Sequence, residues 1–146
     1  MESKIATKIV AILLVLSFLI NIYFLIDKQK RHTDKQKKHD VQYSMNLGLT
    51  SQFYDSSTGT TDYIKAIQFA SKASALSFFT SYAKEDNANV SYTETLLLYF
   101  EELEQKQIKL KKPEEISNTI REVAENPLNN QLWEKLMELV KTELDI

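Results

Sequence analysis

Residues 9–26 read IVAILLVLSFLINIYFLI, a long apolar stretch near the N-terminus. Fourteen of its eighteen residues are Ile, Leu, Val or Phe, and none is charged. As an α-helix the stretch spans roughly 27 Å, close to the hydrocarbon core of a bilayer, which is about 30 Å thick. Each strongly apolar residue favours insertion by roughly 0.3 to 0.6 kcal/mol. We therefore predict a single transmembrane helix over 9–26, preceded by a short tail at 1–8, that anchors the chain in the cell membrane.

A cleaved secretory signal is the alternative interpretation of this stretch. Lys4 and Lys8 resemble the basic start of such a signal. Cleavage also requires small residues in an A-x-A-like site, whereas residues 21–26 are mostly bulky and the chain has no Cys to carry a lipid. A buried helix of a soluble protein is a third interpretation. We expect an uncleaved signal-anchor.

Asn21 is a polar residue inside the apolar stretch. One interpretation is that it forms a hydrogen bond to another membrane helix, worth about 1 kcal/mol or less. The other is that it lies close enough to the membrane surface to be hydrated, because it stands only five residues before Ile26.

The charges around the stretch give opposing signals about orientation. Two lysines precede it, and six cations follow it: Lys28, Lys30, Arg31, Lys35, Lys37 and Lys38. By the positive-inside rule, this distribution would hold the C-terminal domain in the cytoplasm. A short Lys-bearing tail before an apolar run is, however, how an export signal begins. We expect an extracytoplasmic C-terminal domain, and the cytoplasmic alternative stays open.

A basic segment follows the anchor. Residues 27–40 read DKQKRHTDKQKKHD and contain no aliphatic or aromatic side chain. Lys, Gln and Arg favour helix, so we predict a solvated helical stem over 27–45. It is expected to act as a spacer, or to contact anionic lipid or wall polymer through the six cations. His32 and His39 stand seven residues apart, too far along one straight helix to share a metal ion.

The composition excludes several kinds of chemistry. The 146 residues include no Cys, two His and two Gly, so neither a thiolate metal site nor a Gly-rich phosphate loop is available. Residues 41–146 carry ten Lys or Arg and sixteen Asp or Glu, and Lys outnumbers Arg sixteen to two in the whole chain. Both features argue against a nucleic-acid partner. With no nucleophile–base pair in evidence, we expect no enzymatic activity, cofactor or metal.

The remaining residues predict an all-α fold. Both glycines fall in residues 46–61, NLGLTSQFYDSSTGTT, which predict a linker after a helix end or a docked loop. Residues 62–146 are expected to form a small bundle of about four helices. These helices are 62–84, opened by Thr60 or Thr61; 91–110, opened by a capping box from Ser91 to Glu94; 113–125, with Pro113 at its first position; and 127–144, capped by Asn126.

Two classes of function fit this organisation. The first is a single-pass protein that presents a helical interaction or accessory module at the cell envelope to a protein partner or to a second copy. The second is a membrane-tethered sensor that binds a small apolar ligand among Tyr63, Phe79, Tyr99 and Phe100. These rings could equally form the core, and the single Trp133 is expected to pack there too. Asn89 begins a glycosylation sequon, although its Ser91 is already assigned to a helix cap.

Overall fold

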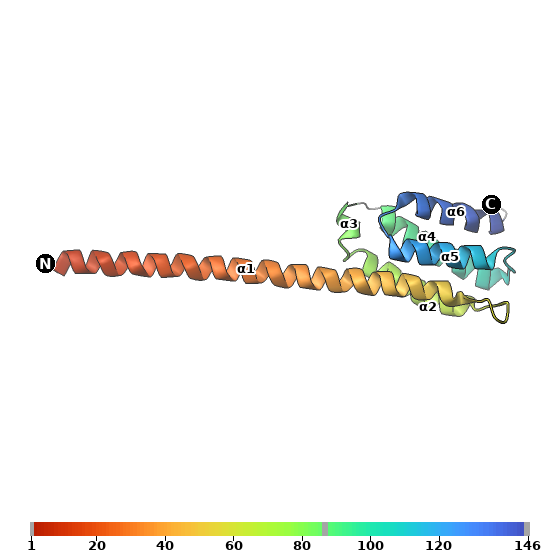
Figure 1. Ribbon diagram of the computed structural model, residues 1–146, viewed down its shortest axis with the longest axis horizontal. Coiled ribbons are helices and arrows are strands. Elements are labelled where there is room, and N and C mark those ends of the chain that lie inside the picture. Colours follow the sequence, from red (N-terminus) through yellow and green to blue (C-terminus); the bar gives the residue numbers. More distant parts are fainter. Residues whose placement is uncertain (1, 86–87, 145–146) are drawn as a thin grey trace. The chain divides into compact units, whose positions relative to one another are not determined.

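The computed structural model describes residues 2–85 and 88–144, and the side chains of residues 10, 12–83 and 88–144 (Figure 1). The described chain is all-α apart from one short hairpin, as predicted. The elements are α1 (Glu2–Thr50), a 3-10 turn η1 (Ser51–Phe53), β1 (Tyr54–Asp55), β2 (Thr60–Thr61), α2 (Tyr63–Ser77), α3 (Tyr82–Glu85), α4 (Ala88–Lys106), α5 (Pro113–Glu125) and α6 (Asn130–Leu144). The chain divides into two compact units after Lys35.

The first unit is the N-terminal part of α1. Its large apolar side chains between Val10 and Ile26 are all exposed where the structure describes them, with exposed fractions from 36% to 67%. By length and composition this helix could cross a membrane. Polar residues follow without a break in the helix, because residues 27–40 lack both Gly and Pro.

The second unit begins within α1, and here the structure corrects the predicted stem and linker. The helix does not end near residue 46 but continues to Thr50. Tyr43, Leu47 and Thr50 are fully buried. Their spacing of four and three residues places them on one face of the helix, which packs into the core. The segment before position 50 therefore contains a buried helix face and not a helix end.

The two glycines have different roles. Gly48 lies inside α1, where a Cβ atom would be 3.6 Å from the Cβ of Ala124 on α5. Gly59 lies in the tight turn between β1 and β2 and adopts a positive φ of 68°. Of the linker predicted over 46–61, only the hairpin that runs from Tyr54 to Thr61 therefore reverses the chain. Asp55 stabilises this turn, since its carboxylate accepts hydrogen bonds from the amide and the hydroxyl of Ser57.

Two helices begin or end elsewhere than predicted. Asp62, and not Thr60 or Thr61, caps α2, because its carboxylate accepts a hydrogen bond from the amide of Lys65 at 2.9 Å. The same helix ends at Ser77 rather than at residue 84, and the short α3 follows.

The predicted capping box at the start of α4 is wrong. This helix begins at Ala88, so Ser91 lies within its first turns. Its hydroxyl is not needed as a cap there, while the carbonyl of Ser91 accepts a hydrogen bond from Thr95. The helix ends at Lys106, four residues before the predicted end.

The last two helices lie side by side in Figure 1. The bounds of α5 and the position of Pro113 in its first turn match the prediction. Asn126 is not the cap of α6, which begins three residues later than expected, at Asn130. Asn129 is the cap, because its side-chain oxygen accepts hydrogen bonds from the amides of Gln131 and Leu132.

The core joins the C-terminal part of α1 to α2, α4, α5 and α6. Trp133 is fully buried, as predicted, and its indole N–H donates to the carbonyl of Pro127 at 3.0 Å. Its ring stacks on Tyr92, with the ring centres 5.5 Å apart. The other large side chains that are almost fully buried are Tyr43, Phe53, Phe100, Leu47, Leu96, Leu103, Ile116, Ile120, Leu136, Val123 and Val140.

Candidate interaction surfaces

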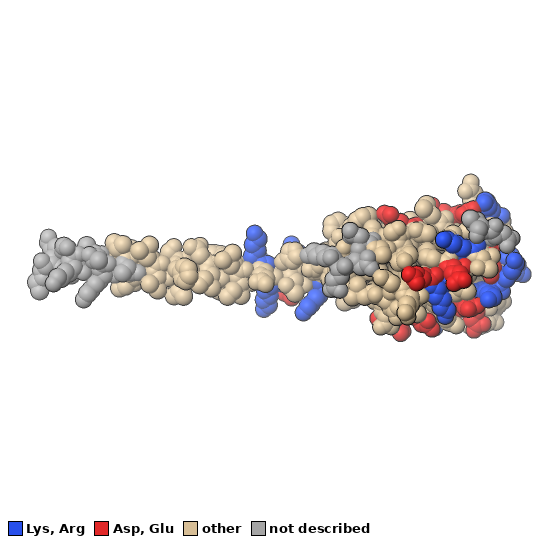
Figure 2. All heavy atoms as spheres, turned by 90° about the horizontal axis from the view of Figure 1, so that it is seen from above, with Lys and Arg blue, Asp and Glu red and all other residues tan. Residues whose placement is uncertain are grey.

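The cations after the apolar stretch lie on the surface of α1. All six predicted positions are exposed, namely Lys28, Lys30, Arg31, Lys35, Lys37 and Lys38. Figure 2 shows Lys and Arg side chains projecting from the helix just beyond its apolar part. Arg31 pairs with Asp27 at 2.8 Å, one helical turn away. The remaining cations are available to an anionic ligand or partner. Lys4 and Lys8, which precede the stretch, lie outside the residues whose side chains are described.

The four aromatic residues predicted to line a ligand pocket do not share one. Tyr63 and Phe100 pack in the core with ring centres 6.5 Å apart, and the Tyr63 hydroxyl donates to the carbonyl of Ile108. Tyr99 is also buried. Phe79 lies apart from these three rings on the surface, 63% exposed, at the loop that follows α2. The structure thus favours the core interpretation for three of the four.

Exposed apolar side chains mark the surface of the second unit instead. Phe78 and Phe79 are adjacent and exposed, and His39 of α1 packs beside the Phe79 ring with the ring centres 5.8 Å apart. Leu98 on α4 and Leu128 before α6 are exposed too. Single exposed apolar residues are ordinary, whereas Phe78 and Phe79 form an adjacent pair of exposed rings.

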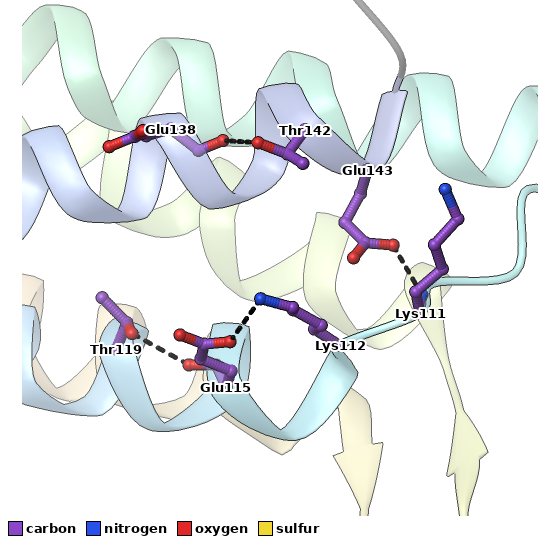
Figure 3. Close-up of polar contacts among 7 residues, drawn as sticks. All are labelled: Lys111, Lys112, Glu115, Thr119, Glu138, Thr142 and Glu143. Atoms are coloured by element: carbon purple, nitrogen blue, oxygen red, sulfur yellow. Dashed lines mark hydrogen bonds and ion pairs between the residues drawn. The ribbon is translucent and has the colours of Figure 1, made fainter.

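A polar groove lies between α5 and α6 (Figure 3). The carboxylate of Glu143 accepts a hydrogen bond from the backbone amide of Lys111 and so holds the connection between α4 and α5. Lys112 pairs with Glu115 at 3.3 Å, and the Thr119 hydroxyl donates to the Glu115 carbonyl. These partners are satisfied within the fold, which gives the groove a structural role.

A buried polar row connects α1 to α4, and the sequence did not indicate it. The hydroxyl groups of Tyr43 and Thr93 lie 2.7 Å apart, and that of Thr93 donates to the carbonyl of Asn89. Burial raises the pKa of Tyr43 to about 12. The Asn89 side chain is 1% exposed, and its two polar atoms have no hydrogen-bond partner in the described structure. The sequon asparagine is therefore inaccessible to glycosylation once the chain is folded.

A second polar contact ties α1 to the start of α3. The Asp40 carboxylate accepts hydrogen bonds from the amide and the hydroxyl of Ser81, at 2.7 and 2.8 Å. The Thr80 hydroxyl accepts another from the amide of Ala83. Within the described residues, no group of three or more His, Cys, Asp or Glu side chains could hold a metal ion.

Comparison of the chain with protein-family models, with curated proteins and with solved structures finds no match.

Proposed function

We propose that the chain is a single-pass membrane protein that presents a helical interaction module at the cell envelope. The observation that carries this proposal is the division of α1. Its N-terminal part exposes a continuous run of large apolar side chains, whereas its C-terminal part supplies Tyr43 and Leu47 to the core of the second unit. One helix thus serves both as an anchor and as a structural part of the folded domain.

Physical chemistry supports a lipid environment for the first part. A soluble monomer rarely exposes a contiguous apolar patch larger than a few hundred Å². Fourteen large apolar or aromatic side chains between Val10 and Ile26 are exposed, on all sides of the helix. A bilayer covers such a surface completely, and a helix satisfies its own backbone hydrogen bonds there. We place the second unit outside the cytoplasm, following the export-signal character of the N-terminal tail.

The second unit supports an interaction role better than a ligand-binding role. Three of the four aromatic residues expected around a ligand are used in the core. Exposed Phe78, Phe79 and Leu98 remain on the surface, where a protein partner would bury them.

Photocrosslinking from the domain surface tests the proposal. The full chain, in its own membranes, would carry a photoreactive residue at Phe79 or Leu98, with Glu101 as an exposed, charged control position on α4. We expect discrete protein adducts from at least one apolar position and none from the control. Absence of adducts, together with a rise in the thermal stability of the solubilised chain on adding small apolar ligands, would favour the sensor function instead.

A further inference from the structure

One face of α1 carries polar and basic side chains, interrupted only by Phe24, from the middle of the apolar stretch to the end of the first unit. Its members are spaced alternately by four and three residues and are all exposed: Ser17, Asn21, Phe24, Lys28, Arg31 and Lys35. At about 100° per residue, they fall within a sector of roughly 80° around the helix. We call these six residues the polar seam. Alternate spacings of four and three are those along which two helices pack.

The opposite face of the same segment has a different character. Gln29 and Thr33 lie there, and Lys30 is about 160° from Lys28. Three of the four cations between residues 27 and 35 therefore belong to the seam. Together with Phe24, Asp27 and His32, these three cations line a shallow groove along the helix.

Acyl chains alone do not complement the part of this face that lies within the apolar stretch. Acyl chains offer no hydrogen-bond partner to an amide, and in the described structure the side chains of Ser17 and Asn21 make no hydrogen bond. A polar group facing hydrocarbon is unfavourable, so polar residues inside a span usually face another helix or water. Asn21 and Ser17 share a face with the cations. A neighbouring helix packed on this face would contact the polar residues and the cations together.

A second copy of the chain does not complement the face either. A symmetric parallel pair packed along the seam would bring Lys28, Arg31 and Lys35 against the same three cations. Like charges placed together across an interface are unfavourable, whereas opposite charges select the correct partner. The complement of the seam is a helix that offers a hydrogen-bonding group at the level of Asn21 and acidic groups beyond it.

We propose that the polar seam docks the transmembrane helix of a partner protein that has a polar residue within its span and acidic residues on the same face just outside the membrane. This inference rests on the proposed membrane anchoring and names the class of partner. Asn21 supplies the hydrogen bond inside the bilayer. Lys28 and Lys35 supply the charge complement at its surface, together with Arg31 when it exchanges its pair with Asp27 for an acidic group of the partner.

A designed peptide provides a defined probe. It would have a Leu-rich span with one Asn, followed by three Glu at spacings of three and four residues. Because the chain has no Cys, Thr33→Cys on the opposite face accepts a single fluorophore. Energy transfer from labelled full chain to labelled peptide would be measured in phosphatidylcholine vesicles. We expect binding that weakens about tenfold when Lys28, Arg31 and Lys35 are all replaced by Glu, as three exposed ion pairs would give.

Matched variants make the result specific. Lys30→Glu changes the same charge on the opposite face and should leave binding unchanged, whereas Asn21→Leu should weaken it. A peptide with Lys in place of Glu should restore binding to the triple variant. Equal effects of Lys30→Glu and the triple variant would overturn the proposal. Energy transfer between labelled copies of the chain, with none to the peptide, would also overturn it. So would binding of a peptide without Glu that requires only the addition of anionic phosphatidylglycerol to the vesicles.

Flotation of the same vesicles separates this inference from the function on which it rests. A chain that floats with the vesicles but does not bind the Glu peptide contradicts only the seam. A chain that fails to float contradicts the proposed membrane anchor itself.

Discussion

The hydroxyl of Tyr43 lies 2.7 Å from the hydroxyl of Thr93, fifty residues later in the chain. Since the Thr93 proton is donated to the carbonyl of Asn89, Tyr43 is the donor in this pair. Both side chains are fully buried. This contact joins the C-terminal part of α1 to α4, so the helix that carries the apolar stretch is also fixed within the domain by a specific polar interaction.

Tyr43→Phe tests the contact and its dependence on pH. The variant should lose about 0.5 to 1.5 kcal/mol of unfolding free energy at neutral pH, the usual worth of one hydrogen bond. The pKa of Tyr43 is about 12 in the folded chain against an ordinary value of 10.0. Its phenol therefore stabilises the fold fully below pH 10, and this contribution is lost as the pH rises toward 12.

Denaturant unfolding in detergent, followed by Trp133 fluorescence between pH 8 and 12, measures both effects. Between pH 8 and 12 the unfolding free energy of the wild type should fall by about 2 to 3 kcal/mol more than that of Tyr43→Phe. Identical alkaline losses in the two proteins would show that Tyr43 does not stay protonated in the fold.

The two glycines should respond to alanine with opposite signs. Gly59→Ala forces a Cβ into a left-handed conformation and should destabilise the chain by about 1 to 2 kcal/mol. Gly48→Ala lies in a helix and places its Cβ at an ordinary contact distance from Ala124. It should stabilise the chain by about 0.5 to 1 kcal/mol. Thermal unfolding by circular dichroism compares them, and a loss of stability in Gly48→Ala would contradict the packing described for α1.

Glu143 should contribute more to the stability of the fold than the exposed residues beside it on α6. A carboxylate near the C-terminus of a helix is disfavoured by the helix dipole, so its burial depends on the hydrogen bond from the Lys111 amide. Glu143→Gln weakens that bond and should reduce the unfolding free energy by about 1 kcal/mol. The exposed Glu138→Gln is the matched control and should stay within about 0.5 kcal/mol of wild type. Equal values for the two variants would refute the role given to Glu143.

Trp133 allows packing and hydrogen bonding to be separated. Trp133→Phe keeps an aromatic ring beside Tyr92 but removes the donor to the Pro127 carbonyl. Trp133→Ala also leaves a large cavity and should destabilise the chain by about 3 to 5 kcal/mol. We expect Trp133→Phe to lose clearly less stability than Trp133→Ala when the two are compared by thermal unfolding. A Phe variant as unstable as the Ala variant would mean that ring packing contributes little.

The parts of the fold that local signals specify could be predicted from the sequence. The apolar stretch stands out by composition alone, and α5 begins at Pro113 because proline suits a first helical turn. Residues 41–53 could not be assigned in this way. Their partners lie far along the chain, as Gly48 with Ala124 and the Ser51 carbonyl with Ser117 show. Gly48, which locally predicts a break, lies inside a helix that packs against α5.

Of the candidate surfaces, the exposed cations could be predicted from the sequence, whereas the role of the aromatic residues could not. The exposed cations after the apolar stretch follow from their sequence context, because nothing nearby can bury them. The aromatic residues did not reveal whether they face a ligand or the core, since both uses have the same helical spacing. Only the fold shows that Tyr63 and Phe100 contact each other while Phe79 stays on the surface.

The most direct test of the central claim is alkaline carbonate extraction of membranes from cells that express the full chain, followed by intact-mass measurement. We predict that the 16.9 kDa chain stays in the membrane pellet. A control with Leu14→Arg and Leu16→Arg places two charges in the span, each unfavourable by roughly 2.5 to 3.5 kcal/mol, and should be released. Recovery of the wild-type chain in the supernatant, or of a shortened chain that begins after residue 26, would contradict an anchoring role for α1.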